Sequence, residues 1–357
     1  MSLLSELTTL RLGGPAGRLV EARSEDDVVA AVAAADAAGD PLLVLAGGSN
    51  VVIADDGFPG TVVRILTMGI EGDGTTLTVQ AGEPWDPLVE RCVNRGLAGI
   101  ECLSGIPGSV GATPIQNVGA YGQEVSEVIT RVRVYDRQAE ALEELPPEDC
   151  GFAYRSSVFK RTPGRWVVLA VTFALDAQPD SRPIRYPELA RELGVEVGET
   201  APLRSVREAV LTLRRRKGMV VDPADPDSVS AGSFFTNPIL EPAEFEQLEQ
   251  RVRDRLGDDA RPPGFPEPDG RVKTSAAWLV ERAGFARGYG APSPIALSTK
   301  HTLAITNRGG GTATQLLALA REIAAGVERE FGVALVPEPV LVGAAWAEEE
   351  EAADAHR

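Results

Sequence analysis

Short apolar runs alternate with helical stretches over the first hundred residues of the chain. Residues 18–23 have the composition of a short strand, and the alanine-rich residues 28–38 have that of a helix. Ser24 stands where a helix N-cap is expected, with Asp27 three residues later in the capping-box position. Gly39 then ends the predicted helix, because glycine readily adopts the left-handed conformation that follows many helices.

A second apolar run, at 41–46, completes a predicted β-α-β unit and leads into Gly-Gly-Ser-Asn at 47–50. In α/β sheets, ligands bind beyond the carboxyl ends of the strands, so this turn is a candidate binding site. Further strands are predicted at 61–65 and 75–81, and a helix is predicted at 86–95.

Proline- and glycine-rich segments separate the remaining elements. Residues 180–200 mix proline, glycine and charged residues, which predicts an excursion over the surface. Residues 223–227 predict a linker and a domain boundary. The pattern predicts strands at 128–136, 166–175, 302–306 and 333–342, and helices at 206–217, 242–256, 274–283 and 312–330.

Composition narrows the class of protein. The chain has 357 residues, which suggests two or three domains, and its 43% hydrophobic content is typical of a soluble globular protein. A formal net charge of −17 argues against a general nucleic-acid binder, which needs a basic surface. Three cysteines without a CxxC pair predict neither a disulfide framework nor a metal site, and favour the cytoplasm. No signal peptide or membrane span is indicated, and residues 346–357 predict a disordered acidic tail.

The most unusual stretch is GIPGSVGATPIQNVGAYG at 105–122, which has five glycines and no charged residue. The spacing of Gly105, Gly108 and Gly111 fits neither the G-x-G-x-x-G fingerprint nor the P-loop. Glycines nevertheless let successive backbone amides approach an anion closely. The stretch therefore predicts either a long irregular loop or an uncharged cradle for an anion.

Three further residues are candidates for chemistry, each with a structural alternative. Arg155 lies in an apolar context, where it would clamp a carboxylate or pack its stem and extend its head into solvent. Ser233 lacks the G-x-S-x-G context of a hydrolase nucleophile, but its hydroxyl can donate a proton to a strongly basic intermediate. Glu338 lies between two prolines, which favours either a rigid, partly desolvated carboxylate or an exposed turn.

Together these segments resemble the UDP-N-acetylenolpyruvoylglucosamine reductases, flavoenzymes of bacterial peptidoglycan precursor synthesis. The matching motifs follow the family's order and span nearly the whole chain. They are GGSN at 47–50, IPGSVG and QNVGAYG within 105–122, YRSSVFK at 154–160, GSFFTNP at 232–238, KTSAAWL at 273–279 and Pro337-Glu338. YRSSVFK and GSFFTNP are the more specific motifs, because the glycine motifs are shared with other flavoproteins.

The resemblance implies an α+β fold, with a two-subdomain FAD-binding module of the vanillyl-alcohol-oxidase type and an α/β substrate-binding domain. The implied FAD-binding subdomains are 1–69 and 70–222, the second of which contains the substrate-loop excursion near 180–200. The implied substrate-binding domain is 223–345, and its last strand carries Glu338.

The resemblance also implies a two-stage reaction on a non-covalently bound FAD. NADPH reduces the flavin, and the hydride then passes to the methylene carbon of UDP-N-acetylglucosamine enolpyruvate, giving UDP-N-acetylmuramate. By matching motif positions, Arg155 and Glu338 polarise the substrate carboxylate, and Ser233 protonates the carbon beside it. A monomer without nucleic-acid or membrane partners is expected.

The implied ligand contacts fall on the glycine motifs and on a few polar residues. Those expected to contact FAD are Gly47, Gly48, Ser49, Asn50, Gly105, Ile106, Pro107, Gly108, Ser109, Val110, Gly111, Ala112, Gln116, Asn117, Gly119, Ala120, Tyr121 and Gly122. Those expected to contact the substrate are Tyr186, Lys217, Asn237 and Lys273. Tyr186 lies in the excursion at 180–200, which resembles the longer of the family's two classes.

Two alternative functions remain open at this point. An oxidase or dehydrogenase of the same flavin fold would take electrons from its own substrate and would not use NADPH. A non-catalytic flavin or UDP-sugar binding protein would have no need of Arg155, Ser233 and Glu338 together.

Overall fold

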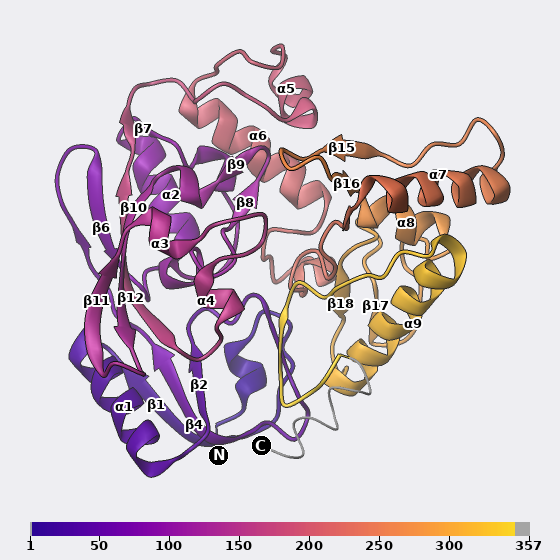
Figure 1. The fold of residues 1–357 in the computed structure, drawn as a ribbon. Coiled ribbons are helices and arrows are strands. Elements are labelled where there is room, and N and C mark those ends of the chain that lie inside the picture. The colour runs from indigo at the N-terminus through magenta and orange to yellow at the C-terminus, as the bar shows by residue number, and fades with distance from the viewer. Residues whose placement is uncertain (1, 347–357) are drawn as a thin grey trace. The chain divides into compact units, whose positions relative to one another are not determined.

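The computed structural model describes residues 2–346, which form two compact units (Figure 1). Unit 1 contains the residues up to Leu3, Pro15–Ser49 and Phe58–Val221, and unit 2 contains Leu4–Gly14, Asn50–Gly57 and the chain from Asp222 onward. Apart from Trp346, the predicted acidic tail at 346–357 lies outside the described residues. Each unit has its own hydrophobic core.

A parallel sheet occupies the N-terminal part of unit 1. Its strands are hydrogen-bonded in the order β1 (Ala16–Ala22), β4 (Phe58–Ile65) and β2 (Leu42–Leu45). Helix α1 (Glu25–Ala38) connects β1 to β2, so the predicted β-α-β unit is confirmed. The predicted caps are also confirmed: Ser24 and Asp27 form a reciprocal capping box, and Gly39 closes the helix at φ 66°.

An antiparallel sheet forms the larger part of unit 1. Its strand order is β11 (Ala141–Leu145), β10 (Ile129–Asp136), β12 (Trp166–Ala174), β6 (Thr76–Gln80) and β5 (Ile70–Glu71). Helix α2 (Trp85–Asn94) packs on this sheet, and its Trp85 is completely buried beside Phe173 of β12. The sequence pattern did not predict β11, because its Glu-rich, half-exposed sequence lacks the apolar run of a buried strand.

Shorter elements connect these sheets. They are β7 (Leu97–Ala98), β8 (Gly119–Ala120), β9 (Gln123–Glu124), α3 (Pro147–Cys150), α4 (Val158–Arg161) and β13 (Asp176–Ala177). The predicted excursion at 180–200 contains helix α5 (Pro187–Leu193), and the helix with the basic end is α6 (Leu203–Arg216). Leu189 of α5 and Val210 of α6 are buried in one hydrophobic cluster, so the excursion is anchored on α6.

Unit 2 packs helices against short strand pairs. Its helices are α7 (Pro242–Leu256), α8 (Ala276–Arg282) and α9 (Ala313–Phe331), as the pattern predicted. Its strands are β3 (Val51–Ile53), β14 (Ile239–Leu240), β15 (Gly264–Pro266), β16 (Val272–Thr274), β17 (Ile295–Leu297), β18 (Ile305–Asn307) and β19 (Val340–Val342). Leu10 and Val52 are buried in the same core as α9, which explains why two N-terminal segments belong to this unit.

The last strand is shorter than the sequence pattern predicted. It begins at Val340 and pairs in parallel with β3, so Glu338 precedes the strand instead of lying within it. Pro337 and Pro339 have no amide hydrogen to donate, and the pairing that precedes β19 here is an isolated antiparallel bridge between Pro337 and Phe235.

Candidate active site

Two glycine turns of unit 1 lie in direct contact. A Cβ added to Gly47 would lie 2.6 Å from the Cα of Gly108, and one added to Gly108 would lie 2.6 Å from Ser49 Oγ. Only glycine allows the two backbones to approach this closely. The structure therefore brings the motif at 47–49 and the stretch at 105–122 together, as expected for two parts of one binding site.

The backbone amides of these turns differ in whether they are available to a ligand. Those of residues 110–112 donate to backbone carbonyls at 2.9 to 3.1 Å, so they have no hydrogen left for a phosphate. Within the described part of the chain, the amides of Gly48, Ser49, Gly108 and Ser109 donate to no protein acceptor. Neighbouring N–H groups on glycine turns form an anion-binding concavity, so these four donors fit the pyrophosphate of FAD.

Asn117 anchors the glycine stretch from within. Its buried side chain donates to Glu124 Oε2 at 2.8 Å and to Ala153 O at 3.2 Å, and accepts from the Ser126 amide at 3.1 Å. These bonds engage both of its N–H groups. Asn117 therefore ties the stretch to the turn that carries Arg155, and it has no donor left for the expected contact with FAD.

Arg155 is held against the glycine stretch by this tight turn. Ala153 and Ser156 exchange backbone hydrogen bonds of 3.0 and 3.1 Å, and Arg155 between them has a φ of 50°. A positive φ is uncommon outside glycine, and such strain concentrates at functional sites. Arg155 Nη2 donates to Gly119 O at 2.7 Å, so the guanidinium is docked on the stretch and does not simply extend into solvent.

The expected substrate contacts of unit 1 meet at Tyr121. Its ring packs edge-on against the ring of Tyr186, with 5.4 Å between the centroids, and Lys217 Nζ lies 5.7 Å from its centroid. Burial raises the pKa of Tyr121 to about 12 and also raises the pKa of Tyr186. Both hydroxyls therefore remain neutral hydrogen-bond donors at physiological pH.

Ser233 and Glu338 lie on neighbouring segments of unit 2. The Glu338 amide donates to the carbonyl of Phe234, the residue after Ser233, at 2.8 Å. Asn50 binds the same segment, because its Nδ2 donates to Glu338 O at 3.3 Å and its carbonyl accepts from the Val340 amide at 3.0 Å. The structure thus brings together two of the three predicted catalytic residues and one predicted cofactor contact.

The other expected substrate contacts of unit 2 lie on paired strands. Asn237 precedes β14, in which Ile239 pairs with Lys273 of β16. Asn237 Oδ1 accepts from the Ala276 amide at 3.0 Å, and Lys273 Nζ pairs with Glu267 Oε1 at 2.6 Å. Each side chain therefore has a structural partner within the unit.

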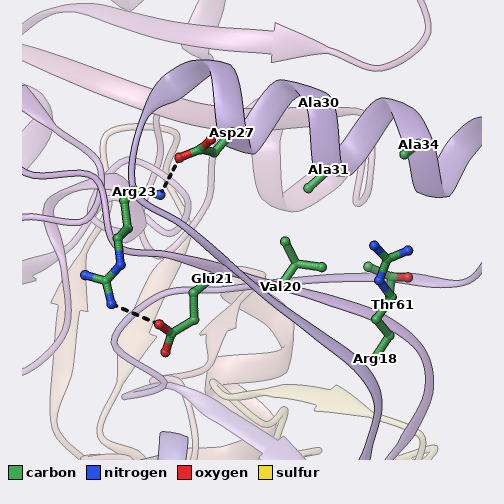
Figure 2. A pocket seen from close by; sticks show the side chains of 9 residues that line it. All are labelled: Arg18, Val20, Glu21, Arg23, Asp27, Ala30, Ala31, Ala34 and Thr61. Atoms are coloured by element: carbon green, nitrogen blue, oxygen red, sulfur yellow. Dashed lines mark hydrogen bonds and ion pairs between the residues drawn. The ribbon is translucent and has the colours of Figure 1, made fainter.

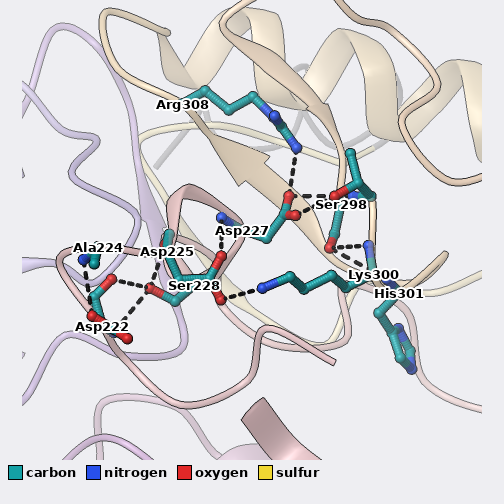
Figure 3. A network of polar contacts seen from close by, with 10 residues as sticks. Asp222, Ala224, Asp225, Asp227, Ser228, Ser298, Lys300, His301 and Arg308 are labelled. Atoms are coloured by element: carbon teal, nitrogen blue, oxygen red, sulfur yellow. Dashed lines mark hydrogen bonds and ion pairs between the residues drawn. The ribbon is translucent and has the colours of Figure 1, made fainter. Parts of the chain in front are cut away.

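A polar network that the sequence analysis missed fixes the segment leading to Ser233 (Figure 3). Asp227 is buried, and its carboxylate accepts a hydrogen bond from Arg308. Farther along, the Phe234 amide donates to Leu303 O at 2.7 Å. The segment predicted as a linker is therefore fixed beside β18. Its acidic composition is typical of an exposed segment, so the sequence did not predict that Asp227 is buried.

Arg214 is a cation near the glycine stretch that the sequence analysis did not single out. Its Nε is completely covered and lies 3.5 Å from where a Cβ on Gly105 would be. Its Nη2 donates to Met219 O at 2.8 Å. Burial lowers the pKa of the guanidinium, while Tyr121 and Asp86 oppose that shift. The uncharged stretch thus has a partly buried positive charge beside its first residue.

A surface depression lies elsewhere in unit 1, between β1 and α1 (Figure 2). It is lined by Arg18, Val20, Glu21, Arg23, Asp27, Ala30, Ala31, Ala34 and Thr61. Arg23 pairs with Glu21 at 2.9 Å, and its amide donates to Asp27 at 3.1 Å. None of the residues expected to contact FAD or substrate lines this depression, so it has no part in the candidate site.

The cysteines of unit 1 are buried thiols of low reactivity. Burial raises the pKa of Cys92 to about 11 and that of Cys150 to about 12, and it also raises the pKa of Cys102. The thiolate is the nucleophilic form, so these protonated groups are poorly suited to attack a flavin ring.

Residues 2–346 contain no cluster of His, Cys, Asp or Glu side chains arranged to hold a metal ion. Nor do the described helices include one with the length and apolar character needed to cross a bilayer.

Family models match two parts of the chain. Residues 16–143 match an FAD binding domain, and residues 223–342 match the C-terminal domain of UDP-N-acetylenolpyruvoylglucosamine reductase. The expected combination of an FAD-binding module with a second domain of this family is confirmed.

Curated relatives match nearly the whole chain. It is 58% identical over 345 residues to the UDP-N-acetylenolpyruvoylglucosamine reductase of Thermobifida fusca, which covers 95% of this chain and 96% of the relative. It is 59% identical over 343 residues to that of Streptomyces coelicolor, covering 96% and 89%. A crystal structure of the reductase from Thermus caldophilus shares the fold, with a TM-score of 0.65 at 24% identity over 96% of this chain and 97% of that one. The chain belongs to the UDP-N-acetylenolpyruvoylglucosamine reductase family.

Proposed function

We propose that this protein reduces UDP-N-acetylglucosamine enolpyruvate to UDP-N-acetylmuramate, with NADPH as electron donor and FAD as cofactor, as a cytoplasmic monomer. One observation carries the proposal. The three groups that the chemistry needs are present in a chain of this family, with Arg155 docked on the glycine stretch and Ser233 beside the Glu338 segment. A binding protein would need none of these groups in such places.

The charge that develops on the substrate determines the roles of these residues. Hydride addition to the methylene carbon leaves negative charge on the neighbouring carbon, delocalised into the carboxylate. Arg155 would stabilise that charge, which is usually the largest catalytic contribution. Ser233 would donate its proton to the carbon, because a carbanion is basic enough to take it from an oriented hydroxyl. Glu338 beside a carboxylate requires a proton or an intervening cation to offset the repulsion.

The glycine turns would hold FAD without a covalent bond. When bound, FAD supplies hydride transfer from NADPH to the enolpyruvyl group. The available amides at 48–49 and 108–109 would bind its pyrophosphate, with Arg214 as the nearby positive charge. Tyr186, Lys217 and Asn237 would contact the diphosphate of the substrate, and Lys273 is a further expected substrate contact.

The decisive experiment follows NADPH oxidation by the purified yellow protein with and without the enolpyruvyl sugar nucleotide. Rapid oxidation only when the sugar nucleotide is present is expected, with UDP-N-acetylmuramate as product. The alternative, an oxidase or dehydrogenase of the same fold, predicts that NADPH is inert and that a different substrate reduces the flavin.

Gly47→Ala is expected to release the cofactor. The new methyl group would meet the Gly108 backbone, and overpacking of this kind costs ~1–3 kcal/mol, so FAD binding should weaken by about tenfold or more. Gly39→Ala is the control, because it adds the same methyl group at a strained left-handed φ of 66° but with nothing within 4 Å of the added Cβ. The ratio of flavin to protein absorbance measures both variants. If Gly47→Ala retained as much flavin as Gly39→Ala, the contact between the two glycine turns would not be needed for FAD binding.

A further inference from the structure

Lys217, the expected diphosphate contact of unit 1, already holds an anion of the protein itself. Its Nζ lies 2.6 Å from Glu188 Oε2, and the two side chains are 26% and 33% exposed. Glu188 lies in the first turn of α5, two residues after Tyr186. Helix α5 and its N-cap residue therefore provide both an expected substrate contact, Tyr186, and the carboxylate of Glu188 that pairs with Lys217.

A second ion pair joins the same two helices at a short distance. Glu192, one turn after Glu188 on α5, pairs with Arg216 of α6 at 2.7 Å. Arg216 is 62% exposed and is adjacent in sequence to Lys217. The two pairs have the same charge types and connect α5 (Figure 1) with the end of α6, but Glu192 pairs with Arg216 and Glu188 pairs with Lys217.

We propose that Glu188 is a tethered competitor for the diphosphate site. This inference rests on the proposed function, because it takes Lys217 as the residue that binds the diphosphate. A phosphate oxygen in contact with Lys217 Nζ would meet the Glu188 carboxylate at close range, and like charges at such distances repel. The diphosphate must therefore displace the carboxylate, and the carboxylate returns when the diphosphate leaves.

Such competition suits an enzyme that handles several phosphate-bearing molecules in turn. The sugar-nucleotide substrate and its product carry the same diphosphate, and the product must leave before the next turnover begins. A carboxylate fixed beside the cation has a high effective concentration, so it lowers the affinity for both substrate and product. Glu188 would thus weaken binding of the substrate and speed the release of the product.

The test titrates UDP, the fragment that substrate and product share, into the FAD-loaded enzyme by isothermal calorimetry. Glu188→Gln is expected to lower the Kd for UDP by about two- to five-fold, the range set by partly exposed ion pairs. Glu192→Gln makes the same charge change on the same helix and is expected to leave the Kd unchanged. Glu188→Asp restores the carboxylate and should return the Kd toward the wild-type value.

The sign of the change separates this role from a structural one. Damage to α5 would weaken UDP binding, whereas removal of a competitor strengthens it. Lys217→Met is expected to raise the Kd by at least about tenfold, since it removes a charged hydrogen-bond donor. If Lys217→Met weakens binding but Glu188→Gln does not tighten it, only the competition is wrong. If Lys217→Met has no effect, the assignment of Lys217 fails, and the competition fails with it.

Discussion

Ser233→Ala is expected to leave reduction of the flavin by NADPH intact and to slow its reoxidation by the enolpyruvyl substrate by about 10²- to 10⁴-fold. The reason is that only the second half-reaction needs a proton on carbon, and alanine has none to donate. Stopped-flow absorbance of the flavin measures the two half-reactions separately, on one preparation of the enzyme.

Ser230→Ala is the matched control for this variant. Ser230 lies three residues earlier on the same segment and is buried, and its Oγ accepts from the Gly232 amide at 3.2 Å. Its loss should loosen the segment without removing a reacting group, so both half-reactions should stay near the wild-type rates. If Ser233→Ala slowed the two half-reactions equally, the hydroxyl would not be the proton donor.

The sequence predicted the ends of an element correctly where short capping motifs mark those ends. Ser24 and Asp27 at the start of α1, and Gly39 after it, have the predicted caps because capping depends on neighbouring residues alone. The predicted final strand was too long, because its start was placed by the apolar pattern alone, although the two prolines beside Glu338 lack the amide hydrogens that a strand donates.

The candidate site depends on contacts between distant segments, which spacing cannot predict. Gly47 and Gly108 touch although sixty residues separate them, and only the resemblance to a family assigned both to one cofactor. Asp227 and Arg214 were missed for a different reason. A buried carboxylate in a polar linker, or a covered guanidinium at a basic helix end, has the same local sequence as a solvated one.

Arg155→Lys is expected to slow reoxidation of the reduced flavin by the enolpyruvyl substrate by about 10²- to 10³-fold, the usual cost of removing one group that stabilises developing charge. Lysine keeps the positive charge but lacks the planar fork that matches a carboxylate, so the substitution isolates geometry from charge. Reduction by NADPH is expected to remain within a few-fold of wild type, because no substrate carboxylate takes part in it.

Arg161, which binds the turn around Arg155, provides the control substitution for this prediction. Arg161 donates to Gly151 O at 3.0 Å and to Ser156 Oγ at 3.0 Å, so it supports the same turn through partners that lie outside the glycine stretch. Arg161→Lys should therefore keep both half-reactions. Arg155 also donates to Gly119 O, and a purely structural role there would disturb the flavin site itself. Flavin loss in Arg155→Lys, or parallel slowing of both half-reactions, would assign Arg155 to that structural role and leave the substrate carboxylate to another cation.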